Sequence, residues 1–368
     1  MSIESTVVLG GLVCAMVLGA AAQRSNFCTM GALSDIVNMG HWGRMRMWAL
    51  AMAVAMAGTA ALSQAGLIDL TQAVAMRPRL PWLSLLVGGV LFGVGMTLAG
   101  GCANKNLLRA GSGSLRSLVV LLVLAVSASL ALKGLFAQWR AQWLDPVALD
   151  LAALGWKDQG LPNLLQQATG LAPQPAALAT TGVLVLALLV WVFADRRFRS
   201  QGWQVLGGTV IGACVVAGWY VSGHLGFGEN PETLEMAYFA TNSRAMESMS
   251  FVGPLAYGLE LLQRWTDQSL KISFGIASVL GVVLGAAAVS LATGRFRWEG
   301  FASLDDLRQQ LAGAVLMGFG GVTALGCTVG QGLSGVSTLA IGSFLALAGI
   351  IAGAVTTLKF LLWRAERD

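Results

Sequence analysis

A series of apolar runs, each long enough to cross a lipid bilayer, constrains this chain of 368 residues more than any other feature. A membrane-spanning helix needs about 20 predominantly apolar residues. About nine such runs follow one another, at residues 6–22, 47–65, 82–99, 115–136, 176–194, 203–221, 272–292, 309–326 and 337–361. We therefore predict an all-α integral membrane protein, built as a bundle of about nine transmembrane helices.

The scarcity of charge supports this prediction. Charged residues make up 11% of the chain and hydrophobic residues 56%, whereas soluble domains carry about 25% charged residues. So few charges cannot cover a surface that faces water, and lipid must solvate the protein instead. No basic segment precedes the first run, so we expect it to be retained as a span rather than cleaved as a signal peptide.

Four segments between the runs are too short or too polar to span, and we expect short re-entrant helices there. They cover residues 25–40, 100–114, 222–262 and 327–335. Residues 137–175 form the longest extramembrane loop, whose three tryptophans suit an interfacial position. Most basic residues fall on the cytoplasmic side if the N-terminus is outside and the C-terminus inside. The net charge of +5 therefore indicates topology rather than nucleic-acid binding.

An internal repeat relates two parts of the chain. Residues 90–112 align with residues 315–337 at an offset of 225, and nine of the 23 positions are identical, Cys102 and Cys327 among them. The two aligned spans are five apart in order, so they cross the membrane in opposite directions. Such inverted repeats are typical of secondary transporters. We predict repeat halves at about 1–136 and 203–361, joined by the loop 137–175 and the span 176–194.

Both repeated segments break at a glycine followed by the cysteine. Irregular backbone at membrane depth is tolerated where it lines a cavity or is buried in protein. Helix N-termini that enter from opposite faces would meet near the centre and favour anions. Candidate donors beside Cys102 are Asn104, Lys105 and Arg109, and beside Cys327 they are Thr328 and Gln331.

A third candidate, Cys28, follows Arg24 and Asn26 just after the first span. At the repeat offset its segment meets residues 249–254, where the match is weak. Simpler interpretations stay open: a glycine–cysteine pair can serve close packing, and Lys105 and Arg109 can be interfacial anchors. For Asp35 and Glu260 we expect a cap or an ion pair, and Cys14 and Cys214 lie in uniformly apolar stretches, where a cysteine acts as a small hydrophobe.

Several classes of function are excluded or disfavoured by missing motifs. The five cysteines show no CxxC spacing and the chain has two histidines, so we expect no metal site and no cofactor. No GxxxxGK[ST] sequence occurs, which excludes ATP-driven pumping by this chain. A transporter, a passive channel for a small anion, and a membrane sulfurtransferase or redox enzyme that uses the same cysteines remain as alternatives.

Three motifs resemble those of the YeeE/YedE family of sulfur-compound transporters: QRSNFC at 23–28, AGGCANKNLLRAGSG at 99–113 and MGFGGVTALGCTVGQGLSG at 317–335. The resemblance covers essentially the whole chain. It implies an inverted-repeat helical bundle that takes up thiosulfate across the bacterial inner membrane and is not an enzyme. It also implies that Cys28, Cys102 and Cys327 line the pathway, and that a small TusA-like cytoplasmic sulfur carrier is a plausible partner.

Thiosulfate chemistry suits protonated thiols. The anion carries two negative charges, much of them on a soft terminal sulfur, and a thiol is a weak donor that suits this acceptor. We therefore expect a non-covalent relay between S–H groups, with a covalent persulfide relay as the less favoured alternative. The chain departs from the family pattern at Asn104 and Lys105, and at Leu325 before Gly326. Both departures bear on selectivity among sulfur and selenium species.

Overall fold

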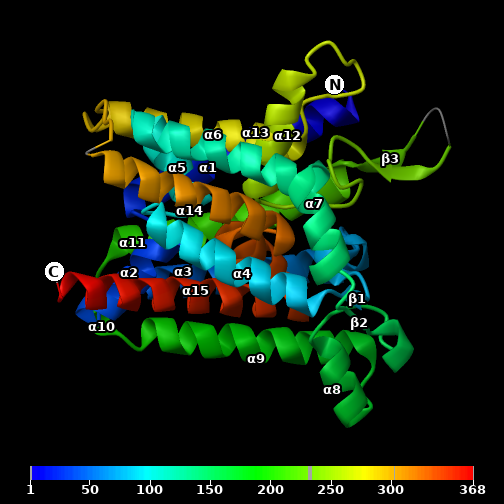
Figure 1. Ribbon diagram of the computed structural model, residues 1–368. Helices are drawn as coiled ribbons and strands as arrows, with labels where there is room; N and C mark the ends of the chain where they lie inside the picture. The colour runs from blue at the N-terminus through cyan, green and yellow to red at the C-terminus, as the bar shows by residue number, and fades with distance from the viewer. Residues whose placement is uncertain (1, 231–233, 302, 368) are drawn as a thin grey trace.

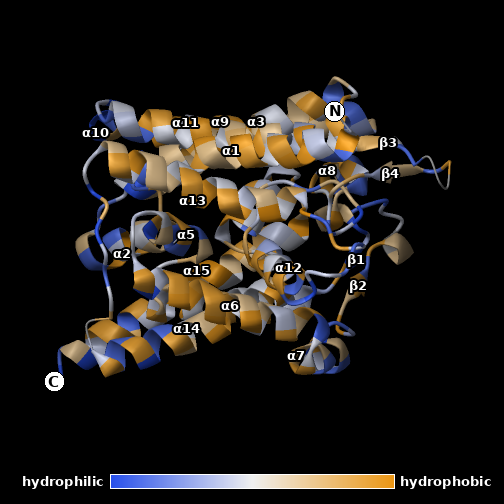
Figure 2. Cartoon of the chain, turned by 90° about the horizontal axis from the view of Figure 1, so that it is seen from above, coloured by the Kyte–Doolittle hydropathy of each residue, from blue (hydrophilic) through white to orange (hydrophobic). Residues whose placement is uncertain are grey.

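The computed structural model describes residues 2–230, 234–301 and 303–367. Long helices run side by side, and the two termini lie at opposite ends of the bundle (Figure 1). Hydrophobic residues follow the helices, whereas hydrophilic ones gather toward the two ends (Figure 2). The helices are α1 (Ile3–Ser25), α2 (Thr29–Met39), α3 (Gly43–Gln64), α4 (Trp82–Leu98), α5 (Ala103–Gly111), α6 (Leu115–Lys133), α7 (Leu135–Trp139), α8 (Pro162–Thr169), α9 (Pro173–Phe193), α10 (Arg196–Arg199), α11 (Gly202–Tyr220), α12 (Val252–Gln263), α13 (Phe274–Ala292), α14 (Leu304–Thr323) and α15 (Ile341–Ala365).

Short helical turns and two small sheets complete the described chain. Both sheets are antiparallel pairs, and in the second Phe227 lies opposite Tyr238. The turns are η1 (Leu70–Gln72), η2 (Val74–Met76), η3 (Arg140–Leu144), η4 (Ala152–Leu154), η5 (Val221–Leu225) and η6 (Gly330–Gly335), and the strands are β1 (Arg79–Leu80), β2 (Leu149–Asp150), β3 (Phe227–Glu229) and β4 (Met236–Tyr238).

The expected all-α membrane protein is confirmed, with one adjustment to the number of spans. Among the described residues, eight helical segments are long and apolar enough to cross a membrane. The remaining predicted span, 309–326, corresponds to α14, which begins five residues earlier than expected, at Leu304. Its first turn carries Asp305 and Asp306, and these charges lower its mean hydropathy. The helix still lies within the bundle, packed against α4 and α6 (Figure 1).

Glycine allows the helices to pack at backbone distance. A Cβ added at Gly93 of α4 would stand 2.2 Å from the carbonyl oxygen of Ile350 in α15, and one added at Gly353 would stand 2.2 Å from that of Val90. Without a hydrophobic force between helices in lipid, such close van der Waals packing drives their association. Small residues at these crossings therefore hold α4 against α15.

The helix contacts come in matched sets. The pair α1 and α13 corresponds to α11 and α3, and the pair α4 and α15 corresponds to α14 and α6. The short helices follow the same scheme, because α12 packs against α6 as α2 packs against α15. The two members of each set are equivalent if α1, α2, α3, α4 and α6 correspond to α11, α12, α13, α14 and α15, in that order. The division into halves at 1–136 and 203–361 stays a prediction, which this correspondence supports.

The segment between the proposed halves is more structured than a loop. Residues 137–175 contain the end of α7, the turn η3 and the helix α8, and α9 follows and packs against α3. Trp139 and Trp143 are exposed, at 58% and 73% of their surface. Exposed tryptophans beside a membrane-spanning bundle suit the interfacial position that the sequence predicts.

Candidate functional site

The first break in the helical path lies between α1 and α2. α1 ends at Asn26, whose backbone has a left-handed φ of 54°, and Cys28 caps the N-terminus of α2. The Cys28 sulfur accepts a hydrogen bond from the backbone N–H of Gly31 at 3.3 Å. The cysteine is buried. A thiol thus lies where free backbone N–H groups and the helix dipole favour negative charge.

The second break lies between α4 and α5, and two side chains of α5 hold it. Gly100 adopts a φ of 66°, and Cys102 then occupies the N-cap position of α5. Asn106 Nδ2 donates to the carbonyl oxygens of Gly101 at 2.9 Å and Cys102 at 3.2 Å. Arg109 Nη1 donates to the Gly100 carbonyl oxygen at 2.9 Å. The arginine therefore contacts the backbone of the break in addition to carrying its charge toward the cysteine.

The third break lies between α14 and the helical segment that contains η6. Leu325 has a φ of 56°, a left-handed conformation that costs a non-glycine residue about 1–2 kcal/mol. Gln331 Nε2 donates to the carbonyl oxygen of Ala324 at 2.7 Å. Cys327 is fully buried, and its sulfur accepts a hydrogen bond from the N–H of Gly330 at 3.4 Å. The cysteine again occupies the start of a helix.

A fourth break precedes α12 and carries no cysteine. α12 begins at Val252, and Ser250 lies against Gly330, because a Cβ added to that glycine would stand 2.6 Å from the serine hydroxyl. Residues 249–254, which the repeat places opposite the Cys28 segment, therefore supply a hydroxyl rather than a thiol.

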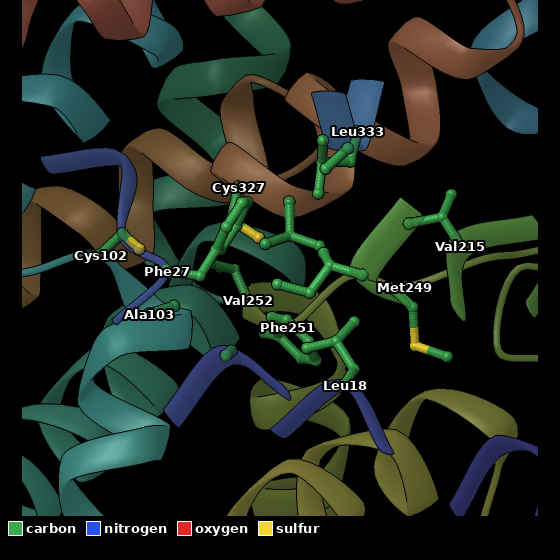
Figure 3. Packing of buried hydrophobic residues seen from close by; sticks show 14 of the residues in the cluster. Leu18, Phe27, Cys102, Ala103, Val215, Met249, Phe251, Val252, Cys327 and Leu333 are labelled. Atoms are coloured by element: carbon green, nitrogen blue, oxygen red, sulfur yellow. The ribbon is translucent and has the colours of Figure 1, made fainter. Parts of the chain in front are cut away.

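The breaks bring the predicted pathway cysteines into one region. The Cys28 and Cys102 thiols lie next to each other, and Thr328, the neighbour of Cys327, lies beside the Cys102 thiol. Figure 3 shows Cys102 and Cys327 in the same buried cluster as Phe27. All three cysteines are free thiols. Residues separated by 299 positions in sequence (327 − 28) thus meet inside the protein.

Three of the other predicted site residues bring unpaired polar atoms to this region. Asn104 Oδ1, Thr328 Oγ1 and Gln331 Oε1 have no hydrogen-bond partner among the described residues. The three residues are only 1%, 0% and 4% exposed, respectively. Because buried polar groups nearly always find a partner, unpaired ones at the breaks are available to a polar ligand.

Positive charge flanks the Cys28–Cys102 side of the cluster. Lys105 interacts electrostatically with both thiols and with Arg44 and Arg109. No salt bridge pairs its ammonium with a described residue. Arg44 Nε pairs with Asp35 at 3.2 Å, which confirms the ion pair expected for that carboxylate. The charge balance on this side is therefore positive, which favours an anion.

Two predicted site residues lie apart from the thiols. Arg24 is exposed and stacks over the ring of Trp203, with 4.7 Å between the guanidinium carbon and the ring centroid. Asn26 is the exposed C-terminal cap of α1. The structure thus groups Asn104, Lys105, Thr328 and Gln331 with the cysteines but leaves these two outside. A substrate-binding role for them stays a prediction without structural support.

Two cavities at the N-terminal end of the bundle reach the third break, and both are lined by Leu325 and Gln331. The first, which we call the arginine cavity, is also lined by Arg77, Arg79 and Arg140. Sequence reasoning missed these arginines as site residues, because they lie in two loops that no motif connects. Their convergence is visible only in the folded chain.

The second cavity, which we call the glutamate cavity, lies beside the first. Glu247, Ser250 and Tyr257 line it on one side, and Gly330 and Gln331 line it on the other. It therefore reaches the residue whose N–H group bonds the Cys327 sulfur. The carboxyl group of Glu247 was not singled out in the sequence, because it stands in a segment without periodicity or motif.

Comparison with known proteins agrees with this arrangement. A sequence model described as sulphur transport matches residues 24–356 of the chain. The chain is similar to a protein of Escherichia coli (strain K12) named thiosulfate transporter TsuA, with 25% identity that covers 98% of this chain and 97% of that one. It is also similar to a protein of the same name from Spirochaeta thermophila, with 26% identity over 96% of this chain and 98% of that one.

The match extends from just before Cys28 to well beyond Cys327, so it includes every break that carries a cysteine. Buried thiols at helix N-termini, the helical bundle and the matched region agree with one another. The protein belongs to the sulphur transport family, the YeeE/YedE family that its motifs predict.

Proposed function

We propose that this protein takes up thiosulfate, or a closely related inorganic sulfur anion, through a pathway lined by Cys28, Cys102 and Cys327. The observation that carries the proposal is the convergence of three buried free thiols at the starts of helices. The names of the two similar proteins support the choice of thiosulfate. The family supports transport of a sulfur compound in general.

The site chemistry fits a relay of the intact anion. An S–H group can donate to the terminal sulfur of thiosulfate, and backbone N–H groups at helix starts can donate to its negatively charged atoms. Lys105 adds a positive charge near two of the thiols, and the Thr328 hydroxyl lies beside the Cys102 thiol. Binding at several weak sites lets an ion enter and leave. We therefore favour a non-covalent relay over a persulfide relay.

The proposal includes a direction. With the N-terminus outside the bacterial inner membrane and the C-terminus in the cytoplasm, the basic clusters at 195–199 and 295–297 lie on the cytoplasmic side. The termini lie at opposite ends of the bundle (Figure 1), as this orientation requires. The arginine and glutamate cavities then face outward. A TusA-like sulfur carrier is the proposed partner on the cytoplasmic side, where it would receive sulfur from the transported anion.

Two alternatives lead to different observations. A sulfurtransferase or redox enzyme needs a reactive, accessible thiolate, but Cys102 and Cys327 are almost completely buried. A passive channel can carry substrate-selective groups as well, so the concentration dependence of the flux separates it from a transporter. A flux that saturates at low thiosulfate concentration supports the transporter over the channel.

Growth on a single sulfur source tests the proposal. A bacterium unable to take up other sulfur compounds is supplied with thiosulfate alone and with the wild-type chain or one of the variants Cys28→Ala, Cys102→Ala and Cys327→Ala. We expect growth with the wild type and loss of growth with each variant at equal expression. The controls are Cys14→Ala and Cys214→Ala, which remove thiols outside the breaks. If all three pathway variants grow as well as the wild type, the cysteines are not needed for transport.

A further inference from the structure

Glu247 is an unexpected residue on an anion pathway. It lies in the segment between β4 and α12, and its side chain lines the glutamate cavity, which ends at Gly330 and Gln331. Gly330 contacts the Cys327 sulfur through its N–H group. An ionised carboxylate at this place would repel a dianion that approaches the thiol from outside. If the anion passes through this cavity rather than through the arginine cavity, the residue must be neutral or compensated by a cation.

Among the described residues, no cation lines the cavity beside this carboxylate. The residues that line the glutamate cavity contain no lysine, arginine or histidine, and Tyr257 is their only other titratable side chain. On the same segment, Arg244 is exposed and does not line the cavity. Among the charged groups of the neighbouring elements, His224 on η5 contacts the carbonyl oxygen of Leu67. Glu260 on α12 pairs with Lys133 at 2.7 Å.

The other elements that pack around the cavity add no charge to it. Lys271, just before α13, pairs with Glu4 at 3.0 Å. Gly275 of α13 and Ser334 of η6 line the wall without a titratable group. Arg77 and Arg140 line the neighbouring arginine cavity rather than this one. Arg140 acts electrostatically on Tyr257 in the wall of the glutamate cavity, but it pairs with Asp145 at 3.5 Å. Among the residues that line the glutamate cavity, Glu247 therefore carries the only carboxyl group.

The structure fixes the position of the Glu247 carboxyl group. Its Oε1 accepts a hydrogen bond from the backbone N–H of Ser243 at 2.8 Å, and its backbone N–H donates to Ser222 Oγ at 3.0 Å. Ser222 Oγ in turn donates to the Glu247 carbonyl oxygen. The side chain is thus held at the cavity wall instead of moving freely in solvent.

We propose that Glu247 is a proton-binding group of the transport pathway, whose carboxyl must be protonated for the thiosulfate dianion to pass from the glutamate cavity toward Cys327. Uptake then rises as the outside pH falls. Burial raises the pKa of Glu247, and hydrogen bonds from Ser243 and Asn242 oppose part of that rise. A raised pKa brings the protonated form closer to physiological pH. The inference rests on the proposed function, because it concerns the same anion.

Uptake by purified protein in proteoliposomes tests the proposal. Initial rates of radiolabelled thiosulfate uptake are measured with outside pH between about 5 and 8, a range in which thiosulfate remains a dianion. Above the pKa of Glu247 the protonated fraction falls about tenfold for each pH unit, and wild-type uptake should follow it. Glu247→Gln keeps an acceptor for the Ser243 N–H and stays neutral, so its uptake should be high and independent of pH.

The controls separate this inference from the proposed function. Glu229→Gln removes an exposed carboxylate outside both cavities on the same face, and it should keep the wild-type pH profile. Glu247→Ala is a second neutral variant if Glu247→Gln folds poorly. A flat wild-type profile, or a Glu247→Gln profile like that of the wild type, would overturn the inference and leave thiosulfate uptake intact. Wild-type protein that takes up no thiosulfate at any pH would overturn the proposed function itself.

Discussion

Asn106 and Gln331 make similar contacts: each follows a buried cysteine by four residues and donates its side-chain N–H to a carbonyl oxygen of the break before it, that of Gly101 or that of Ala324. The two residues are equivalent at the repeat offset, since 106 + 225 = 331. The amides therefore fix the backbone that presents Cys102 and Cys327. The chemistry of the break is conserved between the two segments although the residue type is not.

Replacing either amide by leucine should destabilise the protein. Asn106→Leu leaves the Gly101 and Cys102 carbonyl oxygens without this donor, and Gln331→Leu does the same for Ala324. A buried group left unsatisfied costs about 1–3 kcal/mol, which thermal unfolding in detergent measures. The control is Gln138→Leu, at an exposed amide of α7. Equal melting temperatures for all three variants would show that the amides do not hold the breaks.

The backbone conformation at the breaks predicts that two substitutions change the stability of the protein in opposite directions. Gly100 and Leu325 are equivalent at the repeat offset and have φ values of 66° and 56°. A left-handed conformation costs a non-glycine residue about 1–2 kcal/mol. Gly100→Ala should therefore destabilise the protein by about 1 kcal/mol, and Leu325→Gly should leave its stability equal or higher. A stability loss in Leu325→Gly larger than that in Gly100→Ala would contradict the backbone argument.

Lys105 should affect substrate affinity rather than folding. Its ammonium group interacts with the Cys28 and Cys102 thiols, so Lys105→Met removes the positive charge but keeps an apolar side chain of similar length. A lost charge-assisted contact is worth about 1.5–3 kcal/mol, and every 1.4 kcal/mol is about tenfold in affinity. The KM for thiosulfate should rise at least about tenfold. Lys157→Met, at an exposed lysine, should leave KM unchanged.

The stability of the protein should depend on pH through Glu247. Burial raises the pKa of this carboxyl in the folded state. The folded state therefore binds its proton more tightly than the unfolded chain. The contribution of Glu247 to the free energy of unfolding is fully present below its pKa in the unfolded chain, about 4.3. It is lost as pH rises through its pKa in the folded state. Melting temperatures should fall over that window in the wild type and fall less in Glu247→Gln. Identical slopes in both proteins would show that Glu247 does not titrate with folding.

Much of the fold could be predicted from the sequence because the bilayer imposes a simple rule. The length of apolar runs placed the spans within a few residues; α4, for example, was expected at 82–99 and ends at Leu98. α14 was the exception, because the predicted run began where its charged first turn ends. That turn is largely exposed, with Leu304 at 72%, and its charged side chains place it outside the apolar run although the helix continues through it.

The candidate site could be predicted only where the repeat marked it. Cys102 and Cys327 share an aligned motif, and Gln331 and Thr328 follow from it. Glu247 has no such signal, because only folding brings its segment against η6. Arg24 illustrates the opposite error: it stands near Cys28 in sequence, but the helix turns its side chain toward Trp203. Sequence proximity does not decide which side of a helix faces the pathway.

Competition in purified proteoliposomes tests the central claim most directly. Uptake of radiolabelled thiosulfate is measured for wild type and Cys327→Ala, with unlabelled thiosulfate or sulfate as competitor. If the thiols recognise the terminal sulfur, thiosulfate should compete strongly and sulfate weakly, and folded Cys327→Ala should lose at least about tenfold in uptake. Undiminished uptake by Cys327→Ala, or equal competition by sulfate, would contradict a pathway built on cysteine.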